Sequence, residues 1–439
     1  MKVLKFGGTS VGSAQRMKEV AKLITDGEQK IVVLSAMSGT TNTLVEISDY
    51  LYKKNPEGAN EIINKLEAKY KQHVDELFAT QEYKQKGLEV IKSHFDYIRS
   101  YTKDLFTLFE EKVVLAQGEL ISTAMVNFYL QECGAKSVLL PALEFMRTDK
   151  NAEPDPVYIK EKLQAQLELY PDMDIYITQG FICRNAYGEI DNLQRGGSDY
   201  TASLIGAAVN ASEIQIWTDI DGMHNNDPRI VDKTAPVRQL HFEEAAELAY
   251  FGAKILHPTC IQPAKYANIP VRLLNTMDPT APGTLISNDT EKGKIKAVAA
   301  KDNITAIKIK SSRMLLAHGF LRKVFEIFES YQTSIDMICT SEVGVSVTID
   351  NTKHLNEILD DLKKYGTVTV DKEMCIICVV GDLEWENVGF EAKALDAMRD
   401  IPVRMISFGG SNYNISFLIR ECDKKVALQS LSDMLFNGK

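Results

Sequence analysis

The chain begins with Met-Lys-Val-Leu-Lys-Phe-Gly-Gly-Thr-Ser (residues 1–10), in which a short apolar run meets two glycines and two hydroxyls. Residues 1–6 are predicted to form a strand and residues 13–25 a helix, so the polar residues lie on a strand-to-helix turn. Glycines there expose backbone N–H groups, and the start of the next helix carries positive partial charge. Lys5 adds a full charge. Such a turn fits a polyphosphate, although many strand-to-helix turns contain Gly-Gly for their geometry alone.

The length and composition set the class of protein. With 439 residues the chain is too long for one ordinary hydrophobic core, so two or three domains are expected. A hydrophobic fraction of 45% with 25% charged residues is typical of a soluble globular protein. The formal net charge of −10 argues against nucleic acid or an anionic membrane as the main partner.

The cysteines favour a reducing compartment, which we expect to be the cytoplasm. There are seven of them at irregular spacing, which argues against a disulfide framework. Cys375 and Cys378 form a C-x-x-C pair in a predicted buried strand, where residues three apart point to opposite faces, so no metal site is expected. The N-terminal apolar run breaks at Gly7, no signal peptide is visible, and no uninterrupted apolar stretch approaches the ~20 residues of a membrane helix.

The first part of the chain alternates predicted strands with predicted helices. The strands are expected at residues 1–6, 30–34, 174–178 and 213–217, and the helices at 13–25, 42–50, 200–209, 242–251 and 259–267. Residues 55–111 are charged, periodic and poor in turn signals, and they are predicted to form a helical insertion. The alternation predicts a mainly parallel sheet with helices on both faces, in which ligands bind at the carboxyl ends of the strands.

The C-terminal part contains an internal repeat. The composition changes near residues 280–295, which we interpret as a hinge. Residues 325–349 and 394–419 each have the pattern of a helix, a strand, a turn and a strand, and a further helix is predicted after each copy, at 354–364 and 424–435. Two repeated α+β modules are more typical of a regulatory unit than of a catalytic one.

The sharpest internal motif is Arg-Gly-Gly-Ser-Asp at residues 195–199, before the predicted helix 200–209. Two glycines, a hydroxyl and an acid make an anion-binding nest, and Arg195 adds a planar fork suited to a carboxylate. An ordinary capped helix is the alternative. Glu119 is predicted to stand at the start of a helix, where it either favours the helix dipole or holds a substrate ammonium.

Further polar residues follow the predicted strand 213–217. Thr218 and Asp219 end this strand, and Arg229 follows in a loop rich in turn-forming residues. Lys254 lies just past the end of the predicted helix 242–251, where it neutralises a phosphate or pairs with the helix dipole. The chain has no G-x-x-x-x-G-K-[ST], H-R-D or D-F-G motif, which excludes a P-loop NTPase and a protein kinase.

Six motifs occur in an order that resembles the aspartate kinase family. They are residues 5–10, 118–120, 195–199, 217–219, 227–229 and 251–258, and the resemblance extends over nearly the whole chain. It implies an α/β fold of the amino acid kinase type over residues 1–290, a mainly parallel sheet sandwiched by helices. Two ferredoxin-like α+β ACT modules are implied at 297–380 and 381–439. In this family the second module can be threaded into the first.

The resemblance also implies a reaction, in which ATP and L-aspartate give 4-phospho-L-aspartate and ADP on the route to lysine, threonine, methionine and isoleucine. Mg²⁺ arrives with ATP, and no metal ligand from the protein is expected. The implied catalytic residues are Lys5 and Asp199, of which Asp199 orients either the substrate or the lysine. The implied aspartate-binding residues are Thr41, Glu119, Arg195 and Ser198. The implied nucleotide-binding residues are Lys5, Gly7, Gly8, Thr218, Asp219, His224, Arg229 and Lys254.

Regulation by an amino acid, with L-lysine as the expected effector, is implied as well. The implied effector-binding residues are Met314, Gly319, Phe320, Leu321, Ser334 and Asp336. The sequence departs from the family pattern at four positions, namely Gln194, His224, Leu316 and Ala317. Paired ACT modules usually bury their sheet edges against another copy, so a homodimer or a dimer of dimers is expected.

Two other hypotheses stay open. The chain could be another amino acid kinase, acting for example on glutamate or carbamate, but the tandem repeats and the Lys254 region argue against this. It could also be an amino-acid sensor with an inactive kinase domain. The presence of Lys5, Glu119, Arg195 and Asp199 argues against the sensor.

Overall fold

The computed structural model describes residues 1–193, 196–252, 256–311 and 318–437. The chain divides into two compact units, Met1–Met223 with Leu256–Asn288, and His224–Ile255 with Asp289–Lys439. The sequence prediction assigned residues 1–290 to one catalytic domain. As a compact unit, residues 224–255 group with the C-terminal part of the chain, and the catalytic-domain bounds stay a prediction.

The first unit is built on a largely parallel sheet, which confirms the prediction. Its strands are β1 (Lys2–Phe6), β2 (Lys30–Leu34), β3 (Ser137–Leu140), β4 (Ile175–Gln179), β7 (Ile214–Thr218), β9 (Val271–Asn275) and β10 (Thr284–Ser287). They lie in the order β3-β4-β2-β1-β7-β9-β10, and β10 is antiparallel to β9. The central strand β1 pairs in parallel with β2 and with β7, so the carboxyl ends of these three strands meet at one edge. A separate hairpin joins β5 (Ile182–Arg184) and β6 (Ile190–Asn192).

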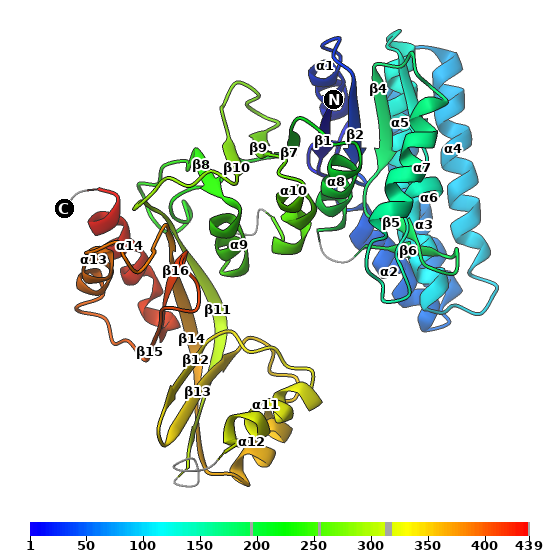
Figure 1. The fold of residues 1–439 in the computed structure, drawn as a ribbon. Coiled ribbons are helices and arrows are strands. Elements are labelled where there is room, and N and C mark those ends of the chain that lie inside the picture. The colour runs from blue at the N-terminus through cyan, green and yellow to red at the C-terminus, as the bar shows by residue number, and fades with distance from the viewer. Residues whose placement is uncertain (194–195, 253–255, 312–317, 438–439) are drawn as a thin grey trace. The chain divides into compact units, whose positions relative to one another are not determined.

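Helices cover this sheet. They are α1 (Ala14–Ile24), α2 (Thr40–Tyr52), α3 (Pro56–Leu77), α4 (Gln81–Ser100), α5 (Leu108–Glu132), α6 (Ala142–Phe145), α7 (Pro156–Glu168), α8 (Gly197–Ala208) and α10 (Gln262–Tyr266), with a 3₁₀ turn η1 (Pro258–Ile261). Figure 1 shows α3, α4 and α5 running side by side. The helices α3 and α4 lie where the helical insertion at 55–111 was predicted, whereas most of α5 follows that range. Residues of β1 and β2 pack with residues of α1 to α5 in one hydrophobic core.

Helix α5 passes through the core of the first unit. By length and composition it is apolar enough to cross a membrane, but 72% of its apolar window is buried within the protein, as in the core helix of a soluble fold. The helix begins at Leu108 behind a capping box formed by Thr107 and Glu110. The prediction that Glu119 stands at the start of a helix is therefore wrong. Gly118 serves close packing there, because a Cβ on it would lie 2.8 Å from the Cβ of Ala36.

The second unit contains a six-stranded antiparallel sheet. The helices and strands of this unit are β8 (Gln239–His241), α9 (Phe242–Tyr250), β11 (Ile295–Lys310), α11 (Phe320–Ser330), β12 (Ile338–Ser341), β13 (Gly344–Ile349), α12 (Leu355–Lys363), β14 (Thr367–Gly381), α13 (Phe390–Ala397), β15 (Met405–Ser407), β16 (Asn414–Arg420), η3 (Glu421–Asp423) and α14 (Lys424–Leu435). The sheet has the order β12-β13-β11-β14-β16-β15. The two predicted helix–strand–turn–strand–helix copies are both present.

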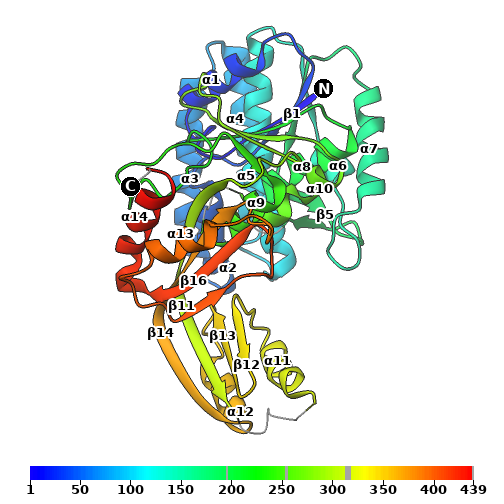
Figure 2. The same cartoon turned by 60° about the vertical axis from the view of Figure 1, so that its left-hand side comes forward.

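Two hydrophobic cores share the long strands β11 and β14 (Figure 1). One core joins Ile307 and Ile309 of β11 to α11 and α12, and the other joins Val298 of the same strand to α13 and α14. Figure 2 shows the division from a second side, with α13 and α14 at one end of the long strands and α12 at the other. The module around α11 and α12 is thus inserted within the other one, and the expected boundary at residues 380 and 381 falls inside β14.

Candidate active site

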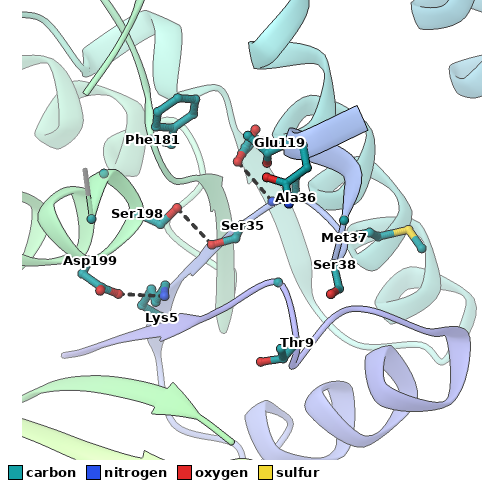
Figure 3. A pocket seen from close by; sticks show the side chains of 16 residues that line it. Lys5, Thr9, Ser35, Ala36, Met37, Ser38, Glu119, Phe181, Ser198 and Asp199 are labelled. Atoms are coloured by element: carbon teal, nitrogen blue, oxygen red, sulfur yellow. Dashed lines mark hydrogen bonds and ion pairs between the residues drawn. The ribbon is translucent and has the colours of Figure 1, made fainter. Parts of the chain in front are cut away.

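A cavity of about 450 Å³ opens at the carboxyl ends of β1 and β2. The turns that follow these strands line it together with the start of α8 and one residue of α5 (Figure 3). The lining residues are Lys5, Gly8, Thr9, Ser35, Ala36, Met37, Ser38, Gly39, Thr41, Asn42, Glu119, Phe181, Gly196, Gly197, Ser198 and Asp199. This is the edge where a ligand is expected in a parallel sheet.

An ion pair between Lys5 and Asp199 forms one wall of the cavity. Lys5 is on β1, and Asp199 is in the first turn of α8. The Lys5 Nζ lies 2.7 Å from the Asp199 Oδ1, and the two side chains are only 11% and 14% exposed (Figure 3). The turn before Asp199 needs a glycine at 196, where φ is +77° and a Cβ would lie 2.6 Å from the Cys260 Sγ. The fold therefore holds a cation in the cavity in a fixed position.

Glu119 enters the cavity from the middle of α5 and is 3% exposed. The backbone N–H of Ala36 donates to its Oε1 at 3.2 Å, and Oε2 has no hydrogen-bond partner among the described residues. Burial raises the pKa of this carboxyl to about 8, although the Ala36 N–H opposes the shift. A buried acid with a free oxygen is the complement of a ligand ammonium, and the alternative of a capping role is excluded by its place within the helix.

Two serine hydroxyls link the turn after β2 to the start of α8. The Ser35 hydroxyl donates to the Ser198 Oγ at 3.0 Å (Figure 3). The Ser122 hydroxyl on α5 donates to the Ser35 carbonyl at 2.8 Å. The predicted substrate residues Thr41, Glu119 and Ser198 are thus brought to one cavity with Lys5 and Asp199.

The predicted nucleotide-binding residues of the first unit follow β1 and β7. Gly8 lines the cavity, and a Cβ on Gly7 would lie 3.4 Å from the Lys5 Nζ. Thr218 ends β7, which is paired with β1, so Thr218 and the exposed Asp219 lie at the same sheet edge as the cavity but outside its lining.

The other predicted nucleotide-binding residues belong to the second unit or lie outside the described residues. His224 has its Nδ1 3.0 Å from the Thr234 hydroxyl. Arg229 is exposed and donates from Nε and Nη2 to both carboxylate oxygens of Asp227, at 2.9 and 2.7 Å, so a phosphate would compete with Asp227. The predicted residues outside the described ranges are Arg195, Lys254 and Met314, together with the noted departures Gln194, Leu316 and Ala317.

The predicted effector residues lie around α11 and before β12. Gly319 caps α11 with φ of +82°, Phe320 is buried and Leu321 is half-buried. Ser334 is exposed, whereas the Asp336 side chain is buried in an ion pair with Lys301.

The sequence interpretation missed several residues that line the cavity. Ser35, Ser38 and Gly39 belong to the small-residue turn after β2, whose position beside β1 in the sheet could have indicated them. Phe181 follows β4 with a φ of +69°, a strained conformation that proteins often place at functional sites. Nothing in the local sequence signals this strain.

Comparison with known proteins agrees with this geometry. Residues 1–275 match the amino acid kinase family, and residues 377–435 match an ACT domain. Aspartokinase 1, chloroplastic, of Arabidopsis thaliana is 36% identical in an alignment 470 positions long, which covers 99% of this chain and 80% of that protein. Lysine-sensitive aspartokinase 3 of Escherichia coli is 33% identical, with 99% of each chain covered.

Solved structures give the same result. The structure of E. coli aspartokinase III in complex with aspartate and ADP has a TM-score of 0.85 at 32% identity, covering 99% of this chain and 100% of that one. The complex of the same enzyme with lysine and aspartate has a TM-score of 0.82 at 32% identity and 99% coverage of both chains. The family resemblance and the fold class expected from the sequence are confirmed, and the chain belongs to the aspartokinase family, kinases that join an amino acid kinase domain to ACT modules.

Proposed function

We propose that the chain transfers the γ-phosphoryl group of ATP to the side-chain carboxylate of L-aspartate, giving 4-phospho-L-aspartate and ADP. One observation carries the proposal: the cavity holds a buried carboxyl with a free oxygen, Glu119, beside a fixed lysine, Lys5. An amino acid that is to be phosphorylated needs an acid for its ammonium and a cation near the phosphate. The similarity to the E. coli enzyme that was solved with aspartate and ADP supports the same assignment.

In this proposal Glu119 accepts the ammonium of aspartate. Arg195 binds the α-carboxylate, and the hydroxyls of Thr41 and Ser198 help to orient the substrate. Thr41 and Ser198 line the cavity with Glu119, which supports a shared role. The Ser35–Ser198 hydrogen bond fixes one of these hydroxyls before the ligand arrives, which lowers the cost of ordering it on binding.

The chemical step needs alignment more than acid–base catalysis. A side-chain carboxylate is already ionised at pH 7, so its oxygen can attack the γ-phosphorus without a base. The new O–P bond forms as the bond to the bridging oxygen of ADP breaks, and no proton moves. Lys5, held by Asp199, neutralises charge on the transferred group, the main contribution expected of a protein to phosphoryl transfer.

The nucleotide binds at the neighbouring strand ends in this proposal. Gly7 and Gly8 present backbone N–H groups to the phosphates, while Thr218, Asp219, His224, Arg229 and Lys254 contact the rest of ATP. The described residues contain no group of three or more His, Cys, Asp or Glu side chains placed to hold a metal ion. In the proposal Mg²⁺ enters on the phosphates of ATP, where it neutralises phosphate charge.

We also propose that L-lysine inhibits the enzyme by binding to the ACT modules, at Gly319, Phe320, Leu321, Ser334 and Asp336 together with Met314. The name of the lysine-sensitive E. coli relative supports this choice of effector. Asp336 supplies a buried acid of the kind that an ammonium requires. We further propose that the protein is cytoplasmic. We also propose that it forms a homodimer or a dimer of dimers, and sedimentation at micromolar concentration tests this oligomeric state.

The deciding experiment traps the acyl phosphate with hydroxylamine from ATP, Mg²⁺ and L-aspartate, with and without L-lysine. Aspartyl hydroxamate that lysine suppresses is the expected result. Turnover that lysine does not change would support the kinase activity but refute lysine as its effector. Turnover with glutamate or carbamate but not with aspartate would refute the substrate, and no turnover with any of them would favour the sensor.

A further inference from the structure

The turn after β2 supplies more residues to the cavity wall than any other continuous segment. Every residue from Ser35 to Asn42 lines the cavity except Thr40. Thr40 is the first residue of α2 and is 1% exposed, so its side chain lies in the protein interior rather than in the cavity. The position of Thr40 therefore sets the position of the turn and of Thr41, which we propose to orient the substrate.

A tyrosine of the helical insertion holds Thr40 from one side. Tyr70 of α3 is 0% exposed, and its hydroxyl shares a hydrogen bond with the Thr40 Oγ1 at 2.8 Å. Burial raises the pKa of Tyr70, so the phenol keeps its proton at neutral pH and the bond joins two neutral hydroxyls. The Tyr70 ring packs on Phe95 of α4, with the ring centres 5.8 Å apart. Two helices of the insertion thus fix the place of the Tyr70 hydroxyl.

The helix that carries Glu119 meets Thr40 from the other side. A Cβ on Gly118 of α5 would lie 3.1 Å from the Thr40 Cγ2, and Gly118 directly precedes Glu119. The same turn also donates the backbone N–H of Ala36 to the Glu119 carboxyl. Thr40 is therefore packed between Tyr70 and the part of α5 that carries the buried acid. A shift of Thr40 would move the turn relative to Glu119.

Lys69, next to Tyr70 on α3, contacts the same turn independently. Its ammonium donates to the Ser38 carbonyl at 3.4 Å, a longer bond from an exposed side chain. An exposed lysine exchanges such a bond with water at little cost, whereas burial shields the hydroxyls of Tyr70 and Thr40 from water. The buried pair therefore contributes more to the position of the turn.

We propose that Tyr70 is a positioning residue for aspartate, which acts through Thr40 to hold the turn after β2 against Glu119. The inference rests on the proposed phosphorylation of aspartate. Without the Tyr70 hydroxyl, the Thr40 hydroxyl loses its partner in the interior, which costs free energy. The start of α2 then shifts until Thr40 finds a new partner, and Thr41 moves with it. Lys5 belongs to β1, so the phosphoryl-transfer step keeps its cation.

The test compares Tyr70→Phe with a matched control, Tyr176→Phe, in kinetic titrations of aspartate and of Mg²⁺–ATP. Tyr176 of β4 is 2% exposed in the same unit, and its hydroxyl donates to the Tyr170 carbonyl at 2.7 Å. We expect Tyr70→Phe to raise the KM for aspartate about five- to tenfold, while kcat and the KM for ATP change by less than about twofold. Tyr176→Phe should lower thermal stability to a similar extent but leave the KM for aspartate unaltered.

Thr40→Val and Thr40→Ser test the same hydrogen bond from its other end. Thr40→Val keeps the shape of the side chain and should raise the KM for aspartate as Tyr70→Phe does. Thr40→Ser keeps the hydroxyl and should raise this KM less. In the double variant of Tyr70→Phe with Thr40→Val both hydroxyls are gone, so the KM should rise no further than in the worse single variant. The Thr40 variants also decide the question should Tyr70→Phe fold poorly.

An unaltered KM for aspartate in Tyr70→Phe would overturn the inference. It is also overturned if the two single effects on the KM multiply in the double variant, because independent residues behave in that way. Both results leave the proposed function intact. Failure of the proposed function is seen separately, in an unaltered protein that forms no aspartyl hydroxamate, and the inference then fails with it.

Discussion

Glu119 in the first unit and Asp336 in the second are both buried carboxyls, but their surroundings differ. Glu119 accepts one backbone N–H, and its second oxygen has no partner among the described residues. Asp336 accepts hydrogen bonds from the Lys301 ammonium and the Tyr250 hydroxyl. Burying an acid without a counter-charge costs free energy that folding must offset elsewhere. The first site therefore fits a ligand that brings the missing cation, while a cation that reaches Asp336 must displace one supplied by the chain.

The largest effect is expected from replacing Lys5, the cation on the far side of the cavity from Glu119. Lys5→Met should lower kcat about 10²- to 10³-fold, because the transferred phosphoryl group loses its fixed positive charge. Hydroxamate formation at saturating substrates measures this. Lys30→Met is the matched control, since Lys30 is a buried, ion-paired lysine at the start of the neighbouring strand β2. Equal losses of kcat in the two variants would show that Lys5 serves the fold rather than the reaction.

Glu119→Gln removes the charge of the unpaired acid and keeps its shape. We expect the KM for aspartate to rise about 10- to 100-fold, because the substrate ammonium loses a hydrogen bond to a charged group. The KM for ATP should change less. Glu67→Gln is the control, because Glu67 is buried in the same unit but is paired with Arg99 and Lys71. An unchanged aspartate KM in Glu119→Gln would refute the ammonium site.

Because the pKa of Glu119 is raised, both kcat/KM for aspartate and the stability of the protein should depend on pH. Only the ionised carboxyl pairs with the ammonium, so kcat/KM for aspartate should rise with pH up to about 8, by up to about tenfold per pH unit, and then level. The folded protein resists this ionisation, so Glu119 lowers stability as pH rises above 4.5, and the cost is complete above about 8. Thermal unfolding should show Glu119→Gln to be more stable than the unaltered protein at about pH 9, with the difference vanishing below about pH 4. A difference that does not change with pH would contradict the assignment.

The sequence predicts the parts of the site that are encoded locally. Lys5 and the glycines after it mark one strand-to-helix turn, and Ser198 and Asp199 lie in the first turn of α8 after a second pair of glycines. Periodicity likewise indicates the alternation of strands and helices. Each of these signals depends only on neighbours in the chain.

The remainder depends on tertiary packing, which a single sequence does not contain. Gln117-Gly118 suggests the start of a helix, but that glycine instead lets α5 approach Ala36, which places Glu119 in the cavity. The pairing of Lys301 with Asp336 joins a residue of β11 to a loop residue 35 positions away. A search for consecutive repeats likewise cannot show that two cores share the strands β11 and β14.

The last expected effect is on stability and concerns the pairing at Asp336. Lys301→Met leaves a buried acid with only the tyrosine hydroxyl, and the free energy of unfolding should fall by about 2–3 kcal/mol in urea titrations. Adding Asp336→Asn removes the charge that was left unpaired, so the double variant should regain part of the loss. A double-mutant cycle at neutral pH gives the interaction between the two side chains directly.

Lys424→Met is the control for this cycle. Lys424 pairs with Asp302 at 2.6 Å, but Asp302 is 35% exposed, so water replaces the lost ammonium and the cost should be about 1 kcal/mol or less. If Lys301→Met costs no more than Lys424→Met, Asp336 does not depend on its internal cation, and the contrast with Glu119 fails. If Lys301→Met costs more than Lys424→Met and adding Asp336→Asn restores stability, Lys301 is the counter-charge that Asp336 requires. It then has the same role beside Asp336 that a ligand cation has beside Glu119.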